Sequence, residues 1–187
     1  MNYATIKKFD IANGPGVRVS VFVSGCRHRC KNCFNYEAWD FNYGNPFDEA
    51  VIDEIIEACG KSYIEGLSLL GGEPMENENR DGLCKLVKKF KEKFPEKTIW
   101  CYTGYVYDTE LLTGKAGDTE SVKELLSYID VLVDGRFEED KKSLALLFRG
   151  SANQRIIDVQ KSLMENKVVL LEGKWERTMG SNDIEEV

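Results

Sequence analysis

The sequence predicts an α/β fold with a mainly parallel sheet, arranged as an open, partial (βα) barrel. Segments that alternate like strands and segments with the apolar period of helices follow one another about every thirty residues, as in βαβ units. A complete barrel of eight such units takes about 250 residues. The chain has 187 residues. We therefore expect a barrel that is not complete.

The first strands lead into a cysteine-rich loop. Residues 1–11 contain a short strand candidate, which the turn Asn13-Gly14-Pro15-Gly16 follows. Residues 17–23 alternate with β-branched side chains on one face, which predicts a strand. That strand delivers the loop 24–33 at its C-terminal end. In parallel α/β folds, ligand sites gather at this end of the strands.

Two amphipathic helices flank the next strand. The first begins after Asp48, a residue suited to the N-cap, and the second ends before Pro95. Between them, a buried strand at 66–70 runs into Gly71-Gly72-Glu73-Pro74, where two glycines let backbone approach a ligand closely. The apolar faces of the two helices consist of Val51, Ile52, Ile55, Ile56 and Cys59, and of Leu83, Leu86, Val87, Phe90 and Phe94.

The second half of the chain continues the alternation. A strand at 98–102 ends in Thr103-Gly104, and a strand at 130–135 has aspartates that we expect to serve as caps or turn residues. The helix between these strands carries Val122, Leu125, Leu126 and Ile129. The polar run 149–155 lies between apolar segments, which indicates ordered structure near a site. Residues 168–171 predict a final strand, and the acidic end 181–187 is expected to fray.

Half of the six cysteines fall within eight residues, as Cys26, Cys30 and Cys33. Three thiolates on one loop can hold three irons of a four-iron, four-sulfur cluster and leave the fourth iron open to a small molecule. A zinc site would need a fourth ligand, which His28 could supply only by crowding the loop. Disulfides fit poorly in a reducing compartment, and coincidence is the remaining alternative. We expect the other thiols to pack in the core: Cys59, Cys84 and Cys101.

The composition is that of an ordinary soluble protein. Hydrophobic residues make up 42% and charged residues 30% of the chain. No apolar run approaches the roughly 18 residues of a membrane span, so we expect one cytoplasmic domain over residues 1–187, with 160–187 as a C-terminal extension. The net charge of −7 and the lack of a long basic stripe argue against binding nucleic acid.

The chain resembles the radical S-adenosylmethionine (SAM) enzymes, specifically the activating enzymes of glycyl-radical proteins. This resemblance covers residues 10–158 and rests on Gly14-Pro15-Gly16-Val17-Arg18, Phe22, Gly25, the run from Cys26 to Cys33, Asn35, and Gly71-Gly72-Glu73-Pro74. Within that group it is most similar to activases of anaerobic (class III) ribonucleoside-triphosphate reductase, through His28, Trp39, Trp100, Thr103-Gly104-Tyr105, residues 131–137 and Arg149-Gly150-Ser151-x-Asn153-Gln154-Arg155.

One residue departs from the family pattern. Members of the family often have glycine just before the third cysteine, where this chain has Asn32. Asparagine tolerates a left-handed backbone better than most residues with a side chain. We therefore expect the loop to keep its shape.

The resemblance implies two cofactors, a [4Fe-4S] cluster held by Cys26, Cys30 and Cys33, and SAM bound to the open iron through its amino and carboxylate groups. One electron passed to the sulfonium would give methionine and a 5′-deoxyadenosyl radical. That radical would take a hydrogen atom from a glycine Cα of the large subunit of the reductase. No side chain needs to act as a general acid or base. A partial barrel of the radical SAM type would offer the wide mouth that a glycine loop of another protein needs.

The resemblance also implies where SAM lies. The backbone of Gly71 and Gly72 would receive its amino group, and Glu73 would orient that turn or contact the ligand. Backbone around 32–34 would lie against the adenine. The implied cofactor-binding residues are, in chain order, Asn32, Cys33, Phe34, Gly71, Gly72, Glu73, Thr103 and Gly104.

The cysteine loop is rich in basic residues on an acidic chain. Arg27, His28, Arg29 and Lys31 predict a basic collar that steers an acidic electron donor such as a flavodoxin and favours the thiolate forms of the cysteines. For His28 the alternative is a hydrogen bond that shapes the loop. Other functions stay open: an activase of pyruvate formate-lyase type, a small radical SAM enzyme with a small substrate, or a non-enzymatic iron-sulfur electron carrier.

Overall fold

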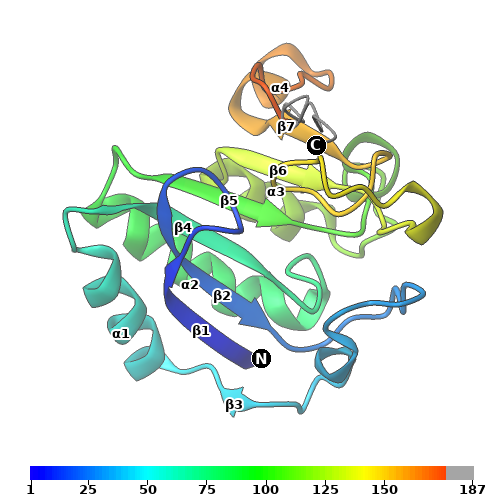
Figure 1. The fold of residues 1–187 in the computed structure, drawn as a ribbon. Coiled ribbons are helices and arrows are strands. Elements are labelled where there is room, and N and C mark those ends of the chain that lie inside the picture. Colours follow the sequence, from blue (N-terminus) through cyan, green and yellow to red (C-terminus); the bar gives the residue numbers. More distant parts are fainter. Residues whose placement is uncertain (176–187) are drawn as a thin grey trace, which may run out of the picture.

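The computed structural model describes residues 1–175, which form one open sheet with three helices packed on one face (Figure 1). The strands are β1 (Asn2–Asp10), β2 (Val17–Val23), β3 (Asn45–Pro46), β4 (Ile64–Gly71), β5 (Thr98–Tyr102), β6 (Val131–Asp134) and β7 (Arg155–Asp158). The helices are α1 (Glu49–Cys59), α2 (Asn77–Lys93), α3 (Thr119–Tyr128) and α4 (Val159–Glu165). Shorter turns of helix are η1 (Tyr36–Trp39), η2 (Tyr107–Leu111) and η3 (Glu139–Lys141).

The seven strands lie in the order β3-β1-β2-β4-β5-β6-β7. The central strands β2, β4, β5 and β6 are parallel, and the outer strands pair antiparallel. The α/β class and the mainly parallel, unclosed sheet are thereby confirmed. The loops that follow the parallel strands lie at one end of the sheet (Figure 1), so segments far apart in the sequence meet there.

Alternation along the strands divides the interior into two clusters. On the face covered by α1, α2 and α3, residues such as Val21 and Leu69 form the main hydrophobic core. On the opposite, open face, a second cluster surrounds Trp100 and includes Val133 and Ile156. The open face is therefore apolar toward β6 and β7.

Several local predictions are confirmed. Asp48 is the N-cap of α1, where its carboxylate accepts a hydrogen bond from the Val51 N–H at 3.0 Å. Cys59 and Cys101 are buried in the main core, and Cys84 packs against it while half-buried. These thiols therefore have packing roles, as free cysteine usually does.

The C-terminal prediction is wrong in detail. Residues 168–171 do not form a regular strand; Leu170 makes only an isolated bridge to Ile157. The edge position beside β6 is taken by β7, which begins at Arg155, the last residue of the polar run. The N-terminal strand is longer than expected, because β1 pairs with both β2 and β3. The acidic end 181–187 lies outside the described residues.

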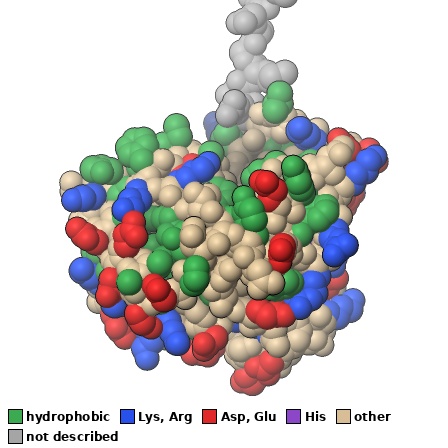
Figure 2. Space-filling model, turned by 90° about the horizontal axis from the view of Figure 1, so that it is seen from below, with side chains coloured by type: hydrophobic (Ala, Val, Ile, Leu, Met, Phe, Trp, Pro, Cys, Tyr) green, Lys and Arg blue, Asp and Glu red, His purple; other side chains and the backbone are tan. Residues whose placement is uncertain are grey.

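The surface mixes charges of both signs. Figure 2 shows acidic and basic side chains interspersed with hydrophobic ones over one face of the molecule. Some exposed charges are paired, such as Lys8 with Glu54 at 2.7 Å. Within residues 1–175, none of the helices is both long and apolar enough to cross a membrane.

Arg18 joins the N-terminal ends of the central strands beneath the open face. Its buried guanidinium makes five hydrogen bonds, all to uncharged oxygens of Pro15, Leu67, Ser68 and Thr98. Burial lowers the pKa of Arg18 to about 10, which leaves it charged at neutral pH. This arrangement satisfies every donor of the group.

We expect Arg18→Lys to destabilise the fold by about 2–4 kcal/mol, since each buried acceptor left unpaired costs about 1–3 kcal/mol and an ammonium lacks the fork geometry of a guanidinium. Urea denaturation measures the free energy of unfolding. Lys8→Ala, which removes only an exposed ion pair, should change it by less than about 1 kcal/mol. Equal stability of the Arg18 variant and the parent would contradict this assignment.

Candidate functional site

A cavity of about 650 Å³ lies where the loops after the parallel strands meet. Its lining comes from the cysteine loop, the ends of β4 and β5, and the segment before β7. Every residue that the sequence singled out as a cluster ligand or a cofactor contact lines this cavity: Cys26, Cys30, Asn32, Cys33, Phe34, Gly71, Gly72, Glu73, Thr103 and Gly104. The fold thus brings together segments that lie far apart in the chain.

The cysteine loop is held by the aromatic segment that follows it. Gly25 donates its N–H to the Ala38 carbonyl at 2.8 Å, and the Cys26 N–H bonds the Trp39 carbonyl at 3.2 Å. Arg29 and Asn32 have left-handed backbone, with φ of 49° and 56°. The expectation that Asn32 adopts this conformation in place of glycine is confirmed.

The turn after β4 packs tightly against the start of that loop. The Gly72 N–H donates to the Val23 carbonyl at 2.7 Å, and the Glu73 N–H donates to the Gly25 carbonyl at 2.8 Å. A Cβ on Gly72 would lie 2.6 Å from the Gly25 oxygen, closer than atoms can approach. Glycine is therefore needed here to seat the turn on the cysteine loop.

The Glu73 carboxylate is the hub of the site. Its side chain is only 1% exposed. It accepts hydrogen bonds from His28 Nε2 at 2.9 Å, Thr103 Oγ1 at 2.7 Å, the Gly104 N–H at 2.7 Å and the Met75 N–H at 2.8 Å. Hydrogen bonds to an ionised group are the strong ones. The carboxylate therefore ties the cysteine loop to the ends of β4 and β5, which favours its orienting role over direct contact with a ligand.

His28 is part of this hub. Its side chain is 5% exposed, and its ring packs edge-on against Tyr105 with centroids 4.4 Å apart. Gly104 lies directly beneath the ring, where a Cβ would come within 2.4 Å of Cδ2. The hydrogen bond to Glu73 supports the interpretation that His28 shapes the loop.

The expected basic collar is therefore wrong in part. His28 faces inward, and Arg27 forms ion pairs with Glu76 and Glu78. Arg29 is exposed, and Lys31 is exposed but lies 3.8 Å from the Glu139 carboxylate.

The pKa values of two of the cysteines run against the expected preference for thiolates. Burial, with the nearby Glu73 charge, raises the pKa of Cys26 to about 12. Burial also raises the pKa of Cys30. A thiol bound to a metal is deprotonated outright, so these directions describe the metal-free protein.

The cysteine sulfurs suit a multinuclear site by their chemistry. All three thiols on the loop are free. Among residues 1–175, no group of three or more His, Cys, Asp or Glu side chains is arranged to hold a metal ion. In a four-iron cluster each thiolate binds a different iron, so the sulfurs need not converge on one point.

Sequence reasoning missed two polar residues that support the site. Glu76, 3% exposed, accepts a hydrogen bond from the Arg27 N–H at 2.9 Å. Asn79 is fully buried and donates to the carbonyls of Ser24 and Glu73, both at 2.9 Å. Glu76 is the N-cap residue of α2, and Asn79 lies on the buried face of that helix, four residues before Leu83. The sequence signal that could have identified them is the presence of polar residues in line with the apolar face of this helix.

Comparison with known proteins agrees with this geometry. A family model described as a 4Fe-4S single cluster domain matches residues 12–157. Anaerobic ribonucleoside-triphosphate reductase-activating proteins are 40% identical over 156 residues in enterobacteria phage T4 and 42% identical over 158 residues in Pasteurella multocida. These matches cover 83% of this chain and 93% and 96% of the relatives. The relative in Escherichia coli K12 is 41% identical over 82% of this chain and 96% of its own length.

The chain belongs to this family of activating proteins.

The family model, a 4Fe-4S single cluster domain, agrees with the three cysteines that line the cavity. The strand-end aspartate Asp134, by contrast, is structural: it accepts hydrogen bonds from Arg155 Nε at 2.9 Å and from the Tyr107 N–H at 2.8 Å. The polar run 149–155 contributes Arg149, Gly150 and Gln154 to the cavity lining. Its predicted place near a site is thereby confirmed.

Glu73→Gln tests the hub. An amide has one acceptor oxygen where the carboxylate has two. Its NH₂ group would face donors that now bond the second carboxylate oxygen, so these donors would lose their partner. We therefore expect the free energy of unfolding to fall by about 2 kcal/mol. We also expect less iron to be retained after anaerobic reconstitution, because the cysteine loop loses its tie to β4 and β5. Glu92→Gln, an exposed carboxyl on α2, is the matched control. Parent-like stability and iron content in Glu73→Gln would refute the role of the hub.

Proposed function

We propose that this chain is the activating enzyme of an anaerobic ribonucleoside-triphosphate reductase and that it uses a [4Fe-4S] cluster and SAM to place a glycyl radical on the large subunit of that reductase. The observation that carries the proposal is the meeting of the three-cysteine loop and the Gly71-Gly72-Glu73 turn in one cavity. The names of the relatives support the choice of reductase.

The donor set fits the proposed cluster. Cys26, Cys30 and Cys33 would be its ligands, and thiolates are the usual ligands of such clusters. The left-handed residues Arg29 and Asn32 bend the loop between successive cysteines. A loop that supplies three sulfurs leaves one iron of the cluster for a ligand.

The cavity also fits SAM. An amino group donates its N–H groups, so the backbone carbonyls of the turn are the groups that would receive the SAM amino group. Residues 32–34 form the side of the cavity proposed for the adenine, and Thr103 and Gly104 line its mouth. Tyr102 also lines the cavity, with a buried hydroxyl that has no hydrogen-bond partner within the described residues. Such a group suits a polar ligand.

The protein's own residues would position the reactants and exclude water. SAM and the reduced cluster supply the radical chemistry, by which a hydrogen atom is removed from the target glycine. Glu73 fixes the turn and the cysteine loop relative to each other through buried hydrogen bonds. Because the transfer moves a hydrogen atom, a catalytic acid or base is not required. His28 serves the geometry of the site in this scheme.

The open sheet agrees with a partial barrel of the radical SAM type. We propose that residues 1–187 act as one radical SAM domain in the cytoplasm, with an open side that admits a loop of the reductase. The rim of the cavity includes Phe34, 83% exposed, and Ile11, 68% exposed. Apolar side chains at a mouth suit contact with another protein.

The electron donor we propose is an acidic protein such as a flavodoxin. Arg29 and Lys31 are exposed on either side of Cys30; the Lys31 side chain is 82% exposed and lies 3.8 Å from the Glu139 carboxylate. Opposite charges raise the rate of encounter, most strongly at low ionic strength.

Cys26→Ala tests the proposed function directly. Without one thiolate the cluster loses a ligand, so 5′-deoxyadenosine and the glycyl radical should both fall to background when reconstituted protein is mixed with SAM, dithionite and the reductase under anaerobic conditions. Liquid chromatography measures the nucleoside and electron paramagnetic resonance measures the radical. Cys84→Ala, which removes a half-buried thiol on α2, should retain both products. Undiminished yield in Cys26→Ala would overturn the ligand assignment.

The electron-donor proposal predicts a salt-dependent rate. Reduction of the cluster by a reduced flavodoxin should slow as ionic strength rises, and Arg29→Ala/Lys31→Ala should lower the low-salt rate by up to about tenfold. Stopped-flow absorbance follows the reduction. Lys85→Ala/Lys88→Ala removes the same charge from the outer face of α2 and serves as control. A rate independent of salt would remove the idea of steering.

A further inference from the structure

We propose that residues 166–175 form a clasp that fixes the loop 144–150 as one wall of the cavity and that Trp175 is the positioning residue of this clasp. The use of this wall in catalysis rests on the proposed function. The existence of the clasp rests on contacts within the described chain.

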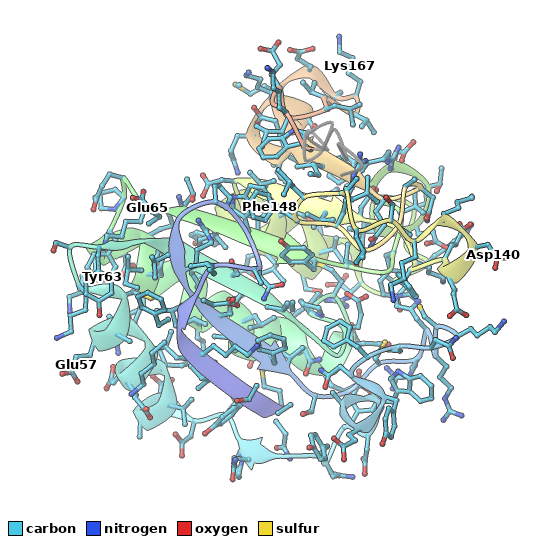
Figure 3. All side chains as sticks on the ribbon, viewed as in Figure 1. Glu57, Tyr63, Glu65, Asp140, Phe148 and Lys167 are labelled. Atoms are coloured by element: carbon cyan, nitrogen blue, oxygen red, sulfur yellow. The ribbon has the colours of Figure 1, made fainter. Side chains whose placement is uncertain are left out.

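The wall consists of consecutive residues between η3 and β7. Five of them line the cavity: Leu146, Leu147, Phe148, Arg149 and Gly150. Phe148 lies against the open face of the sheet, whereas Asp140, earlier in the same connection, lies at its outer end (Figure 3). The wall therefore reaches inward over the sheet and bounds the space that the cofactors would occupy.

Phe148 holds a strained backbone conformation. Its φ of 57° lies in the left-handed region, which a bulky residue adopts only where its surroundings enforce it. Such strain is typical of ligand clamps and other functional segments. The enforcing contacts are two indole rings: Trp100 with centroids 5.6 Å away and Trp175 with centroids 6.1 Å away. The indoles also pack edge-on against each other at 5.9 Å.

Hydrogen bonds connect the clasp to both the wall and the sheet. The Leu147 N–H donates to the Trp175 carbonyl at 2.8 Å. The Trp175 Nε1–H donates to the Leu171 carbonyl at 2.9 Å, and the Leu171 N–H donates to the Ile156 carbonyl of β7 at 2.9 Å. Through Trp175, these hydrogen bonds connect the wall to strand β7 of the sheet.

Gly173 allows the indole to take this position. A Cβ at residue 173 would lie 2.5 Å from Cζ2 of the Trp175 ring. The three atoms nearest to such a Cβ all belong to the Trp175 indole, so alanine at this position would push against that ring. The substitution Gly173→Ala is therefore a second way to open the clasp.

The clasp lies beyond the region that the family model matches. The family model ends at residue 157. The match to the P. multocida relative covers 96% of that protein but 83% of this chain. The clasp therefore rests on the contacts of this chain alone.

Hydrogen exchange of the full chain with its reconstituted cluster tests the clasp. In Trp175→Ala and in Gly173→Ala, peptides covering 144–150 should exchange several-fold faster than in the parent, while peptides covering β2 and β4 should not change. Lys174→Ala, at an exposed neighbouring position, should match the parent. Trp175→Phe, which keeps a ring, should restore most of the protection. Unchanged exchange at 144–150 in both opening variants would overturn the clasp.

The ratio of two products, 5′-deoxyadenosine and the glycyl radical, tests the role of the wall in catalysis. A displaced wall should leave SAM cleavage in place and lower glycyl-radical formation, so the ratio of 5′-deoxyadenosine to glycyl radical should rise several-fold in Trp175→Ala and in Gly173→Ala. A merely structural role would lower both products together. A parent-like ratio alongside faster exchange would refute Trp175 as a positioning residue. If the parent itself yields neither product, the proposed function fails, and the exchange result still decides the clasp.

Discussion

The buried carboxylate of Glu73 lies where three segments of the chain meet. It accepts hydrogen bonds from His28 in the cysteine loop, from its own turn after β4, and from Thr103 and Gly104 after β5. A buried charge is costly unless it is fully hydrogen-bonded, and here the four donors meet that demand. The carboxylate and the loops depend on each other. The buried charge is stable only where the loops supply their donors, and the hydrogen bonds to it hold the loops in place. The positions of the cysteines depend on this constraint.

The open sheet gives the hub its setting. Helices cover one face and build the main core, which leaves the other face free to carry a cavity at one end. Arg18 joins the strands at the opposite end through neutral acceptors. Between these two ends lies the aromatic cluster of Trp100, Phe148 and Trp175. The sheet and the hydrogen bonds to Glu73 together hold the connecting loops around the cavity in a defined shape.

Much of this could be predicted from the sequence, because short-range patterns determine it. Alternation and helical period gave the strands at 17–23 and 98–102 and the helix after Asp48, and the cysteine spacing with Gly71-Gly72-Glu73 placed the site. What could not be predicted depends on pairing between distant segments. Whether 155–158 or 168–171 joins the sheet edge is decided by tertiary packing, since both are short and both carry β-branched apolar residues. That His28 faces a carboxylate, and that Arg27 is neutralised by Glu76, follows only when β2 and β4 lie side by side.

The proposed function requires the loop to supply three sulfurs and to leave one iron of a four-iron cluster for SAM. Mössbauer spectroscopy of the ⁵⁷Fe-reconstituted protein tests it most directly, because it reports the ligand environment of each iron. Addition of SAM should change the isomer shift of one iron in four and leave the other three as they were. A spectrum in which all four irons are alike and unaffected by SAM would contradict the account.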